Sequence, residues 1–474
     1  MFNSRKFAIA CLTLLLLVLA ACGGGNKKEP GSNLSSNNSG SSGNGASSDG
    51  DTASGSSEEK EITITYWVDP RFQFVKGLED QTKDFGDWEK LQAEEFMKLH
   101  PNVKIEVQAL TWDDLGKKVP ASIAAGTQPD ILRDYLGRTA MYAQQGVLEN
   151  LEELVPKEEL DDYIPGYLEQ YTINGHLHAL PSYAWAAGLV VNKQLWKEVG
   201  QEHLLPTPDD PYWTIEEFEQ ALNAIKQGDN VPFVINVATS QGDTALLSLF
   251  FSFGAQFFKD GDYSKTALNS PEAAQALEFL AKLNDAKMLQ PGAVSMQPGD
   301  IDNLFFTGKV GAYGNTLGLF SLVENAKKDG KTNAEFDLML VHMPSANGVE
   351  QGVIVGPTGL AIFKQKDEYK RKMVAEFAMF LNNTEYQKQY AINAGQFPVK
   401  KSAGVPLEDD PNYKTLQKII NERGVEDMGL THPKFAEFRP LLQPEVQAVL
   451  LKSKTPEAAL KSYEEAVKKI LTAN

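Results

Sequence analysis

The chain has 474 residues, of which 42% are hydrophobic and 23% are charged, and its formal net charge at pH 7 is −18. This composition is typical of a globular protein, and the length favours two or more lobes over a single core. The acidity disfavours nucleic acid and anionic membrane surfaces as partners. Both cysteines, Cys11 and Cys22, lie near the N-terminus, so the rest of the chain offers no disulfide, thiolate metal site or cysteine nucleophile.

The first residues have the pattern of an export signal. Arg5 and Lys6 precede an apolar run over residues 7–20, which is too short to span a bilayer comfortably. The run closes with Leu-Ala-Ala followed by Cys22, an ending that resembles the lipobox of bacterial lipoproteins. This resemblance implies a signal peptide over residues 1–21 and a diacylglyceryl group with palmitate-type chains on Cys22. The expected location is the outer face of the cytoplasmic membrane, as in Gram-positive lipoproteins; the alternative is a soluble secreted protein in which Cys22 is incidental.

Residues 22–60 form a low-complexity stretch rich in Ser, Gly and Asn. Such a stretch cannot bury enough apolar area to offset the entropy of ordering, so we expect a disordered tether. As a flexible coil it would span about 30–37 Å, which is enough to hold a folded body clear of a membrane.

Extended and helical patterns alternate from residue 61 onward. Residues 62–67 (Ile-Thr-Ile-Thr-Tyr-Trp) alternate with period two and predict a strand. The apolar face of the helix predicted next carries Trp88, Leu91, Phe96 and Leu99. Residues 103–109 alternate again and predict a second strand. Strand, helix and strand at this spacing predict a βαβ unit in a parallel sheet.

Local signals continue the alternation toward the C-terminus. Asn174 and Gly175 lie between two short extended runs, a pattern typical of a two-residue hairpin turn. Thr214 and Glu217 predict a capping box at the start of a helix. The predicted fold class is α/β.

Motifs for catalysis are missing from the sequence. It contains no Gly-x-Ser-x-Gly elbow, no His-Glu-x-x-His, no Walker loop and no Gly-x-Gly-x-x-Gly. His176 and His178 share a predicted strand face, but two ligands make a weak metal site, and we expect exposed hairpin residues instead. Neither a cofactor nor a metal ion is expected. Paired carboxylates of a glycosidase remain open, because such partners lie far apart in sequence.

Seven short segments follow one another in the order of a known family. They are residues 62–67, 96–103 (Phe-Met-Lys-Leu-His-Pro-Asn-Val), 124–130 (Ala-Ala-Gly-Thr-Gln-Pro-Asp), 174–181 (Asn-Gly-His-Leu-His-Ala-Leu-Pro), 189–193 (Leu-Val-Val-Asn-Lys), 306–311 (Phe-Thr-Gly-Lys-Val-Gly) and 355–362 (Val-Gly-Pro-Thr-Gly-Leu-Ala-Ile). Together they resemble the extracellular solute-binding proteins, family 1, the sugar-type lipoproteins of ABC importers that include maltose-binding protein.

The resemblance implies a fold, a partner and a mechanism. The fold is the two-lobe, periplasmic-binding-protein-like α/β fold, with crossing hinge strands and a ligand cleft between the lobes. The N-terminal lobe is expected over residues 61–183 plus 356–400, and the C-terminal lobe over residues 184–355 plus 401–474. A monomer would close around a small polar solute, a sugar or oligosaccharide, and deliver it unchanged to the transmembrane subunits of an ABC permease.

Ligand-contacting residues are expected where strands end and where the chain crosses between lobes. Sugars need aromatic faces for their apolar side and polar groups for their hydroxyls. The carboxyl ends of the strands and the crossings supply these candidates: Trp67, Asp69, Arg71, Asp134, Tyr183, Trp185, Tyr313, Asn315, Thr358 and Phe397.

One departure from the family keeps the solute open. A tryptophan often follows the segment that residues 306–311 resemble, whereas residues 314–320 here contain none. A peptide or another polar solute therefore remains an alternative to an oligosaccharide. A carbohydrate-active enzyme on the same anchor is the alternative from a different functional class.

Overall fold

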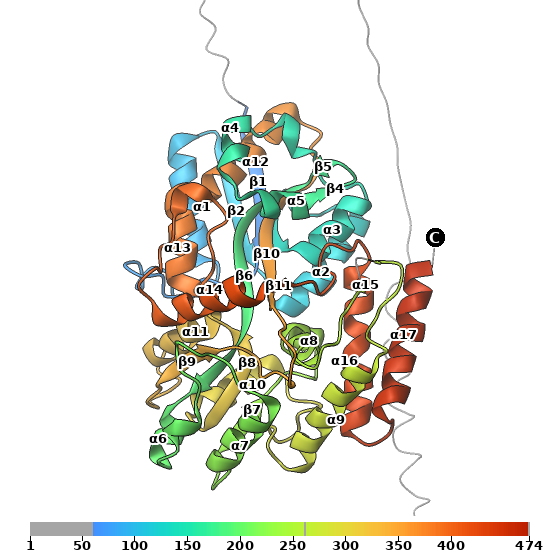
Figure 1. Cartoon of the computed structure of the whole chain (residues 1–474). Coiled ribbons are helices and arrows are strands. Elements are labelled where there is room, and N and C mark those ends of the chain that lie inside the picture. Colours follow the sequence, from blue (N-terminus) through green and yellow to red (C-terminus); the bar gives the residue numbers. More distant parts are fainter. Residues whose placement is uncertain (1–59, 260–261, 473–474) are drawn as a thin grey trace, which may run out of the picture. The chain divides into compact units, whose positions relative to one another are not determined.

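One sheet runs through the part of the chain that the computed structural model describes, residues 60–259 and 262–472 (Figure 1). The strand order is β2-β1-β3-β10-β6-β8-β7, with β11 added to β10 and β9 added to β6. The strands are β1 (Ile62–Val68), β2 (Val103–Ala109), β3 (Ile131–Tyr135), β6 (Ala179–Asn192), β7 (Val231–Val234), β8 (Val310–Thr316), β9 (Leu338–Val341), β10 (Val353–Ile362) and β11 (Val425–Glu426). We call the half of the sheet around β1, β2 and β3, with its helices, the N-terminal lobe, and the half around β7, β8 and β9 the C-terminal lobe. The boundaries expected from the sequence stay a prediction.

The N-terminal lobe begins with the predicted βαβ unit. Strands β1 and β2 pair in parallel from Ile62↔Val103 to Val68↔Ala109. Helices α1 (Asp87–Leu99), α12 (Glu368–Leu381) and α13 (Thr384–Ala394) lie on one side of the sheet, and α2 (Trp112–Ala125), α3 (Leu136–Gln144) and α5 (Pro165–Tyr171) on the other (Figure 1). The α/β prediction is confirmed.

The apolar face predicted for α1 is correct only in part. Trp88 and Phe96 are buried, whereas Leu99 is 66% exposed. Leu99 is the last residue of the helix, and helix α12 contacts this end through the neighbouring residues Phe96 and His100 and not through Leu99.

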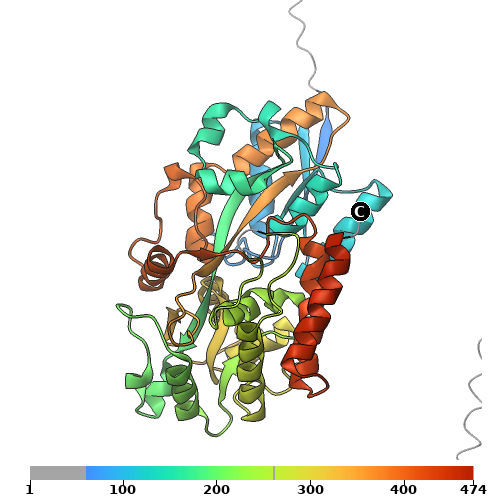
Figure 2. The ribbon, with the colours of Figure 1, turned by 45° about the vertical axis from the view of Figure 1, so that its right-hand side comes forward.

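The C-terminal lobe packs helices around β7 and β8. These helices are α7 (Ile215–Ile225), α8 (Asp243–Phe251), α9 (Pro271–Asp285), α10 (Pro298–Phe306) and α11 (Gly318–Lys328). The predicted capping box is present at the start of α7, where Thr214 accepts from the Glu217 backbone and Glu217 from the Thr214 backbone. The last two long helices, α16 (Leu442–Leu450) and α17 (Pro456–Thr472), lie beside α9 (Figure 2).

Two long strands and one short link join the lobes. Residues 179–186 of β6 pair antiparallel with β10, and residues 187–191 of the same strand pair with β8. Strand β10 pairs on its other edge with β3. The third link is made by Phe397, whose backbone N–H and C=O bond the C=O and N–H of Ala184 at 2.7 and 2.9 Å.

The predicted hairpin is present, with one correction. Asn174 and Gly175 adopt φ values of 54° and 83° between β4 (Thr172–Ile173) and β5 (His176–Leu177). His176 is exposed as expected, but His178 is buried, because its Nδ1 lies 2.9 Å from the Glu149 carbonyl oxygen. No cluster of three metal-ligating side chains occurs among the described residues, and none of the helices within them is both long and apolar enough to cross a bilayer.

A buried histidine lies beside the start of β10. His342 is 4% exposed, with Nδ1 2.9 Å from the Met343 carbonyl oxygen and Nε2 3.4 Å from that of Gly352. Burial lowers the pKa of His342 to about 4, and the two carbonyl groups only partly offset this effect.

The stability of the protein should therefore depend on His342 at mildly acidic pH. Since the folded-state pKa of about 4 lies below the unfolded value of about 6.5, the unfolded chain binds more protons between these two values. The free energy of unfolding should fall by about 3 kcal/mol from this residue as the pH drops through that window. Urea unfolding measures the free energy of unfolding at pH 7.5 and at pH 4.5. The decrease between these two pH values should be smaller for His342→Gln than for the wild type. The exposed His203→Gln serves as control, and equal losses in all three proteins would contradict the prediction.

Candidate ligand-binding site

The candidate site lies where β1 and β3 end beside the crossing strands. Trp67 is near the carboxyl end of β1, and Asp69 and Arg71 follow that strand. In the sheet, Thr358 of β10 lies between Tyr135 of β3 and Tyr183 of β6. The structure thus brings together strand ends that the sequence separates by almost 300 residues.

A buried ion network fixes the chain after β1. Arg133 on β3 is fully buried, and its Nε donates to Asp69 Oδ1 at 2.5 Å while its Nη2 donates to Glu89 Oε1 at 2.5 Å. The Tyr183 hydroxyl donates to Asp69 Oδ2 at 2.7 Å, and Arg71 Nε lies 3.5 Å from the same oxygen. Asp69 therefore ties the end of β1 to β3 and to the crossing strand β6.

The two carboxyl groups of this network differ in their pKa. Burial disfavours ionisation of Asp69, but the charges of Arg133 and Arg71 outweigh it and hold its pKa below the usual range. Burial raises the pKa of Glu89, and Arg133 offsets this only in part. Arg133 thus lowers the pKa of both carboxyl groups, and its effect exceeds that of burial only at Asp69.

Trp185 presents a half-buried indole on a crossing strand. Its partner across the sheet is Gly356, and a β-carbon on Gly356 would lie 2.3 Å from Trp185 Cζ2. Only glycine leaves room for the ring to lie on the neighbouring strand. The Leu430 side chain also lies close to Gly356, since its Cδ1 would be 2.9 Å from a β-carbon at that position.

Three other partly exposed rings of the N-terminal lobe lie against cations. Lys118 Nζ lies 4.6 Å from the ring centre of Trp67, and Arg71 lies 5.1 Å from that of Trp112. Tyr135 is contacted by Arg138 at 4.3 Å. Such pairs combine a flat apolar face with hydrogen-bond donors.

Arg439 reaches the Tyr135 ring from the α15 (Phe435–Phe438) region. Its guanidinium lies 4.9 Å from the centre of that ring. It is held by Asp243 at the start of α8, with Nε–Oδ2 and Nη2–Oδ1 distances of 2.5 and 3.1 Å, and by the Ser240 carbonyl oxygen at 2.9 Å. Tyr135, Arg138 and Arg439 were not expected from the sequence, whereas Trp112, which follows the second predicted strand, was a weak candidate for the mouth of the cleft. A Tyr and an Arg near the end of a predicted strand were the available signal for Tyr135 and Arg138, whereas nothing local marks Arg439.

Asp134 is placed at the end of β3, where the sequence analysis expected it, and is fully buried. Arg138 donates to both of its oxygens at 2.6 Å, and the Tyr135 N–H donates to Oδ1 at 2.8 Å. Its oxygens are therefore occupied by the protein in this conformation, as are those of Asp69. Their contact with a ligand stays a prediction.

The remaining candidates divide between the lobes. Tyr313 on β8 is buried and its hydroxyl donates to Asp302 at 3.2 Å, while Asn315 is partly exposed at the end of the same strand. Thr358 is buried between neighbouring strands, and the Phe397 ring packs against Tyr413 at 4.7 Å. Ligand contact by these four residues is likewise a prediction.

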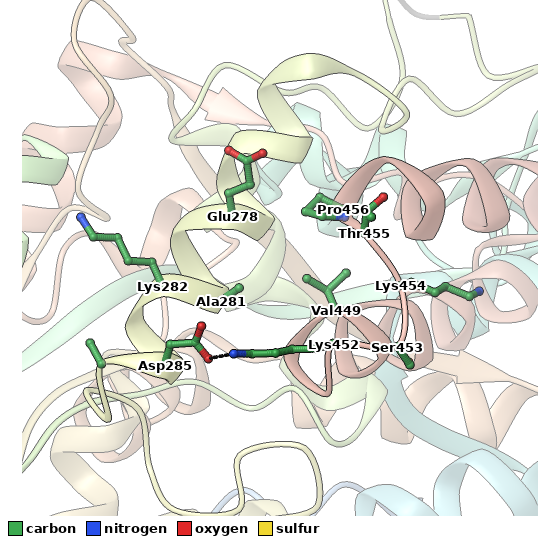
Figure 3. Close-up of a pocket in the computed structure, with 11 residues that line it drawn as sticks. Glu278, Ala281, Lys282, Asp285, Val449, Lys452, Ser453, Lys454, Thr455 and Pro456 are labelled. Atoms are coloured by element: carbon green, nitrogen blue, oxygen red, sulfur yellow. Dashed lines mark ion pairs between the residues drawn. The ribbon is translucent and has the colours of Figure 1, made fainter.

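A surface cavity of about 960 Å³ lies away from the crossing strands, between α9 and the turn from α16 to α17 (Figure 3). Its lysines are paired with carboxylates: Lys452 with Asp285 at 3.0 Å and Lys282 with Glu219 at 2.7 Å. With its cations already paired, this cavity offers no evident ligand chemistry.

Comparison with known proteins gives the family. The sequence model of the bacterial extracellular solute-binding proteins matches residues 79–388. The chain belongs to this family. The resemblance seen in the sequence is thus confirmed, and so is the assignment as a solute-binding protein.

Relatives and solved structures agree with the family. The chain is 25% identical over 349 residues to the Diacetylchitobiose binding protein DasA of Streptomyces coelicolor, covering 72% of this chain and 74% of that protein. An ABC transporter solute-binding protein of Thermotoga lettingae, bound to α-D-tagatose, superimposes with a TM-score of 0.71 at 23% identity, covering 86% of this chain and 99% of that one. An ABC substrate-binding protein of Listeria monocytogenes in complex with cycloalternan gives 0.71 at 20% identity, covering 87% and 99%. These likenesses establish the two-lobe fold.

Removing Arg133 should destabilise the protein strongly. Arg133→Met would leave Asp69 and Glu89 buried without their cation, and breaking a buried pair in this way costs about 3–5 kcal/mol. Urea unfolding measures the change. Lys104→Met, which removes only an exposed pair with Glu106, should change the free energy of unfolding by less than about 0.5 kcal/mol. Equal stability of the two variants would contradict the role of the network.

Proposed function

We propose that this solute-binding protein serves an ABC importer, binds a carbohydrate, specifically an oligosaccharide, outside the cell, and hands it unchanged to the transmembrane permease subunits. The observation that carries the proposal is the position of the Trp185 indole, which lies over Gly356 on the crossing strands. The family of the chain supports the same function. A partly exposed, apolar ring face suits a pyranose, which has one apolar face and a rim of hydroxyl groups.

Side chains that follow β1 and β3 supply the polar half of such a site. Arg71 and Arg138 keep planar donors near aromatic rings, and both are oriented by carboxylates, Asp69 and Asp134. Because the orienting partners are buried, the donors are positioned before the ligand arrives, which reduces the entropy lost on binding.

Closure of the two lobes is the expected mechanism. A ligand that contacts both lobes stabilises the closed form by the difference between its affinities for the two forms. The permease would then recognise the closed form. Relatives with this fold bind a tagatose, a cycloalternan and a diacetylchitobiose, and these names support a carbohydrate as the solute.

The protein is proposed to act as a lipid-anchored monomer without catalysis or cofactor. The anchor rests on Cys22 and the preceding signal pattern, which lie outside the described residues, as does the tether up to residue 59. The absence of enzymatic activity is supported by the family and by the lack of catalytic sequence motifs.

Thermal unfolding with a solute panel tests the proposal. Diacetylchitobiose, cycloalternan, D-tagatose and mixed tripeptides are added at millimolar concentration, and binding to the folded state alone raises the Tm. At least one saccharide should raise the Tm and be recovered unchanged. A shift with peptides alone would favour the peptide alternative, and released hydrolysis products would favour the enzyme.

Truncating Trp185 should weaken saccharide binding. Trp185→Ala removes the ring face and should raise the Kd about 10- to 100-fold, or ~1.4–2.7 kcal/mol, whereas Trp185→Phe, which keeps a ring, should lose less. Isothermal titration measures the Kd. Leu451→Ala, at a 64% exposed side chain beyond α16, is the control and should bind as the wild type does. An unchanged Kd in Trp185→Ala would remove this residue from the site.

Replacing Cys22 should abolish anchoring. Cys22→Ser lacks the thiol that would carry the diacylglyceryl group, so the protein should appear in the medium or keep its signal segment. Cell fractionation and intact-mass measurement report the outcome. A lipidated, membrane-bound Cys22→Ser protein would show that the lipobox prediction is wrong.

A further inference from the structure

The connection between β1 and α1, residues 69–86, is long; we call it the β1–α1 segment. Strand-to-helix connections usually have about 2–6 residues, and loops beyond about 12–15 residues most often serve a function. Because the segment follows the carboxyl end of β1, it starts at the edge of the N-terminal lobe where α/β sheets hold ligands.

The segment is held in shape by its own hydrogen bonds. Thr82 is the centre of these bonds: its carbonyl oxygen accepts from the Phe74 N–H at 2.6 Å, and its hydroxyl oxygen from the Val75 N–H at 2.8 Å. The same hydroxyl donates to the Leu78 carbonyl oxygen at 2.9 Å. The segment is thus a folded turn and not an extended strap.

Two buried side chains fix the segment to the N-terminal lobe. Phe72 and Val75 are each 1% exposed. The Phe72 ring lies 4.8 Å from Trp88 of α1 and 5.9 Å from Tyr183 of the crossing strand β6. The segment therefore moves with the N-terminal lobe.

The outer side of the segment contacts the C-terminal lobe. Asn325 Nδ2 of α11 donates to the Gln73 carbonyl oxygen at 3.1 Å, and one turn further Lys328 Nζ lies 3.6 Å from Glu79 Oε1. Helix α11 begins two residues after β8 ends, so it also starts at the carboxyl edge of its sheet. The contact lies toward the C-terminal end of α11, away from the end of β8, and joins the β1–α1 segment to the C-terminal lobe.

We propose that the β1–α1 segment and α11 form a clamp that holds the lobes closed on bound saccharide, with Asn325 and Lys328 as positioning residues that slow its release without touching it. The inference rests on the proposed function only in that a saccharide is the solute released. The start of α11 also packs against α13 and Gly395 of the N-terminal lobe. An opening movement that carries the far end of α11 away from the β1–α1 segment would break both contacts.

Release kinetics test the clamp in the full chain. Diacetylchitobiose is the probe, with cycloalternan in its place if the disaccharide does not raise the Tm. Asn325→Ala should raise the dissociation rate about 2- to 10-fold, and Lys328→Ala up to about fivefold at low salt, with association rates unchanged. The matched control is Lys327→Ala, which removes the same charge from the same helix but pairs with Glu324 at 2.7 Å.

A charge exchange separates the clamp from a general effect on α11. Lys328→Glu and Glu79→Lys should each speed release, and the double variant should restore slow release at low salt but less so at 0.5 M salt, because salt screens an exposed pair. The proposal would be overturned if Asn325→Ala and Lys328→Ala released the saccharide at the same rate as Lys327→Ala.

A cross-link tests the clamp without any ligand. Glu79→Cys combined with Lys328→Cys places thiols on the two side chains that face each other across the contact, and a bifunctional thiol reagent can join them. The chain's own Cys11 and Cys22 lie near the N-terminus. Small-angle scattering should give a smaller radius of gyration for the cross-linked form than for the same variant before cross-linking; equal radii would overturn the proposal. A wild type that binds no saccharide of the panel would instead contradict the proposed function, and the cross-link would still decide the clamp.

Discussion

Antiparallel pairing between β6 and β10 is the constraint on which both lobes depend. Residues 355–361 of β10 pair with residues 179–186 of β6, and β6 then continues into the other half of the sheet, where it pairs with β8. The lobes therefore share strands and are not joined by a flexible linker. Any relative movement must be absorbed by twisting of these strands and of the link at Phe397.

A buried ion network joins the strands of the N-terminal lobe to the crossing strand β6. Arg133 holds Asp69 and Glu89 in a place without solvent, and Asp69 in turn accepts from Tyr183 on the crossing strand. Burying charges is costly unless each is paired, so the network tolerates little displacement of β1, β3 or β6. The same carboxylate lies beside Arg71, whose guanidinium contacts the partly exposed ring of Trp112.

The fold was largely predictable because its signals are local. Period-two alternation in residues 62–67, the Asn174-Gly175 turn and the capping box at Thr214 each depend on a few neighbouring residues, and the structure contains all three elements. The order of the family segments then supplied the two-lobe topology, which periodicity alone cannot give.

The site was predictable only in outline. The sequence pointed to strand ends, and Trp185 and Asp69 do lie at the meeting of strands. It could not show that Arg133 occupies an oxygen of Asp69, since this pairing spans 64 positions and depends on strand order. Nor could it bring Arg439 to Tyr135, because nothing local in either segment marks the other. The pairing of Asp134 with Arg138, four positions later, had a local signal that the sequence analysis did not use. Long-range pairing of polar groups has no periodic signature.

Gly356 on the neighbouring strand determines how closely the Trp185 ring can approach the sheet. The indole rests where Gly356 has no side chain, and a single methyl group at that position would act as a wedge, 2.3 Å from the ring. Such a methyl group would force the indole away from the strand. The position of the Trp185 ring is thus decided in part by a β-carbon that is missing from the neighbouring strand.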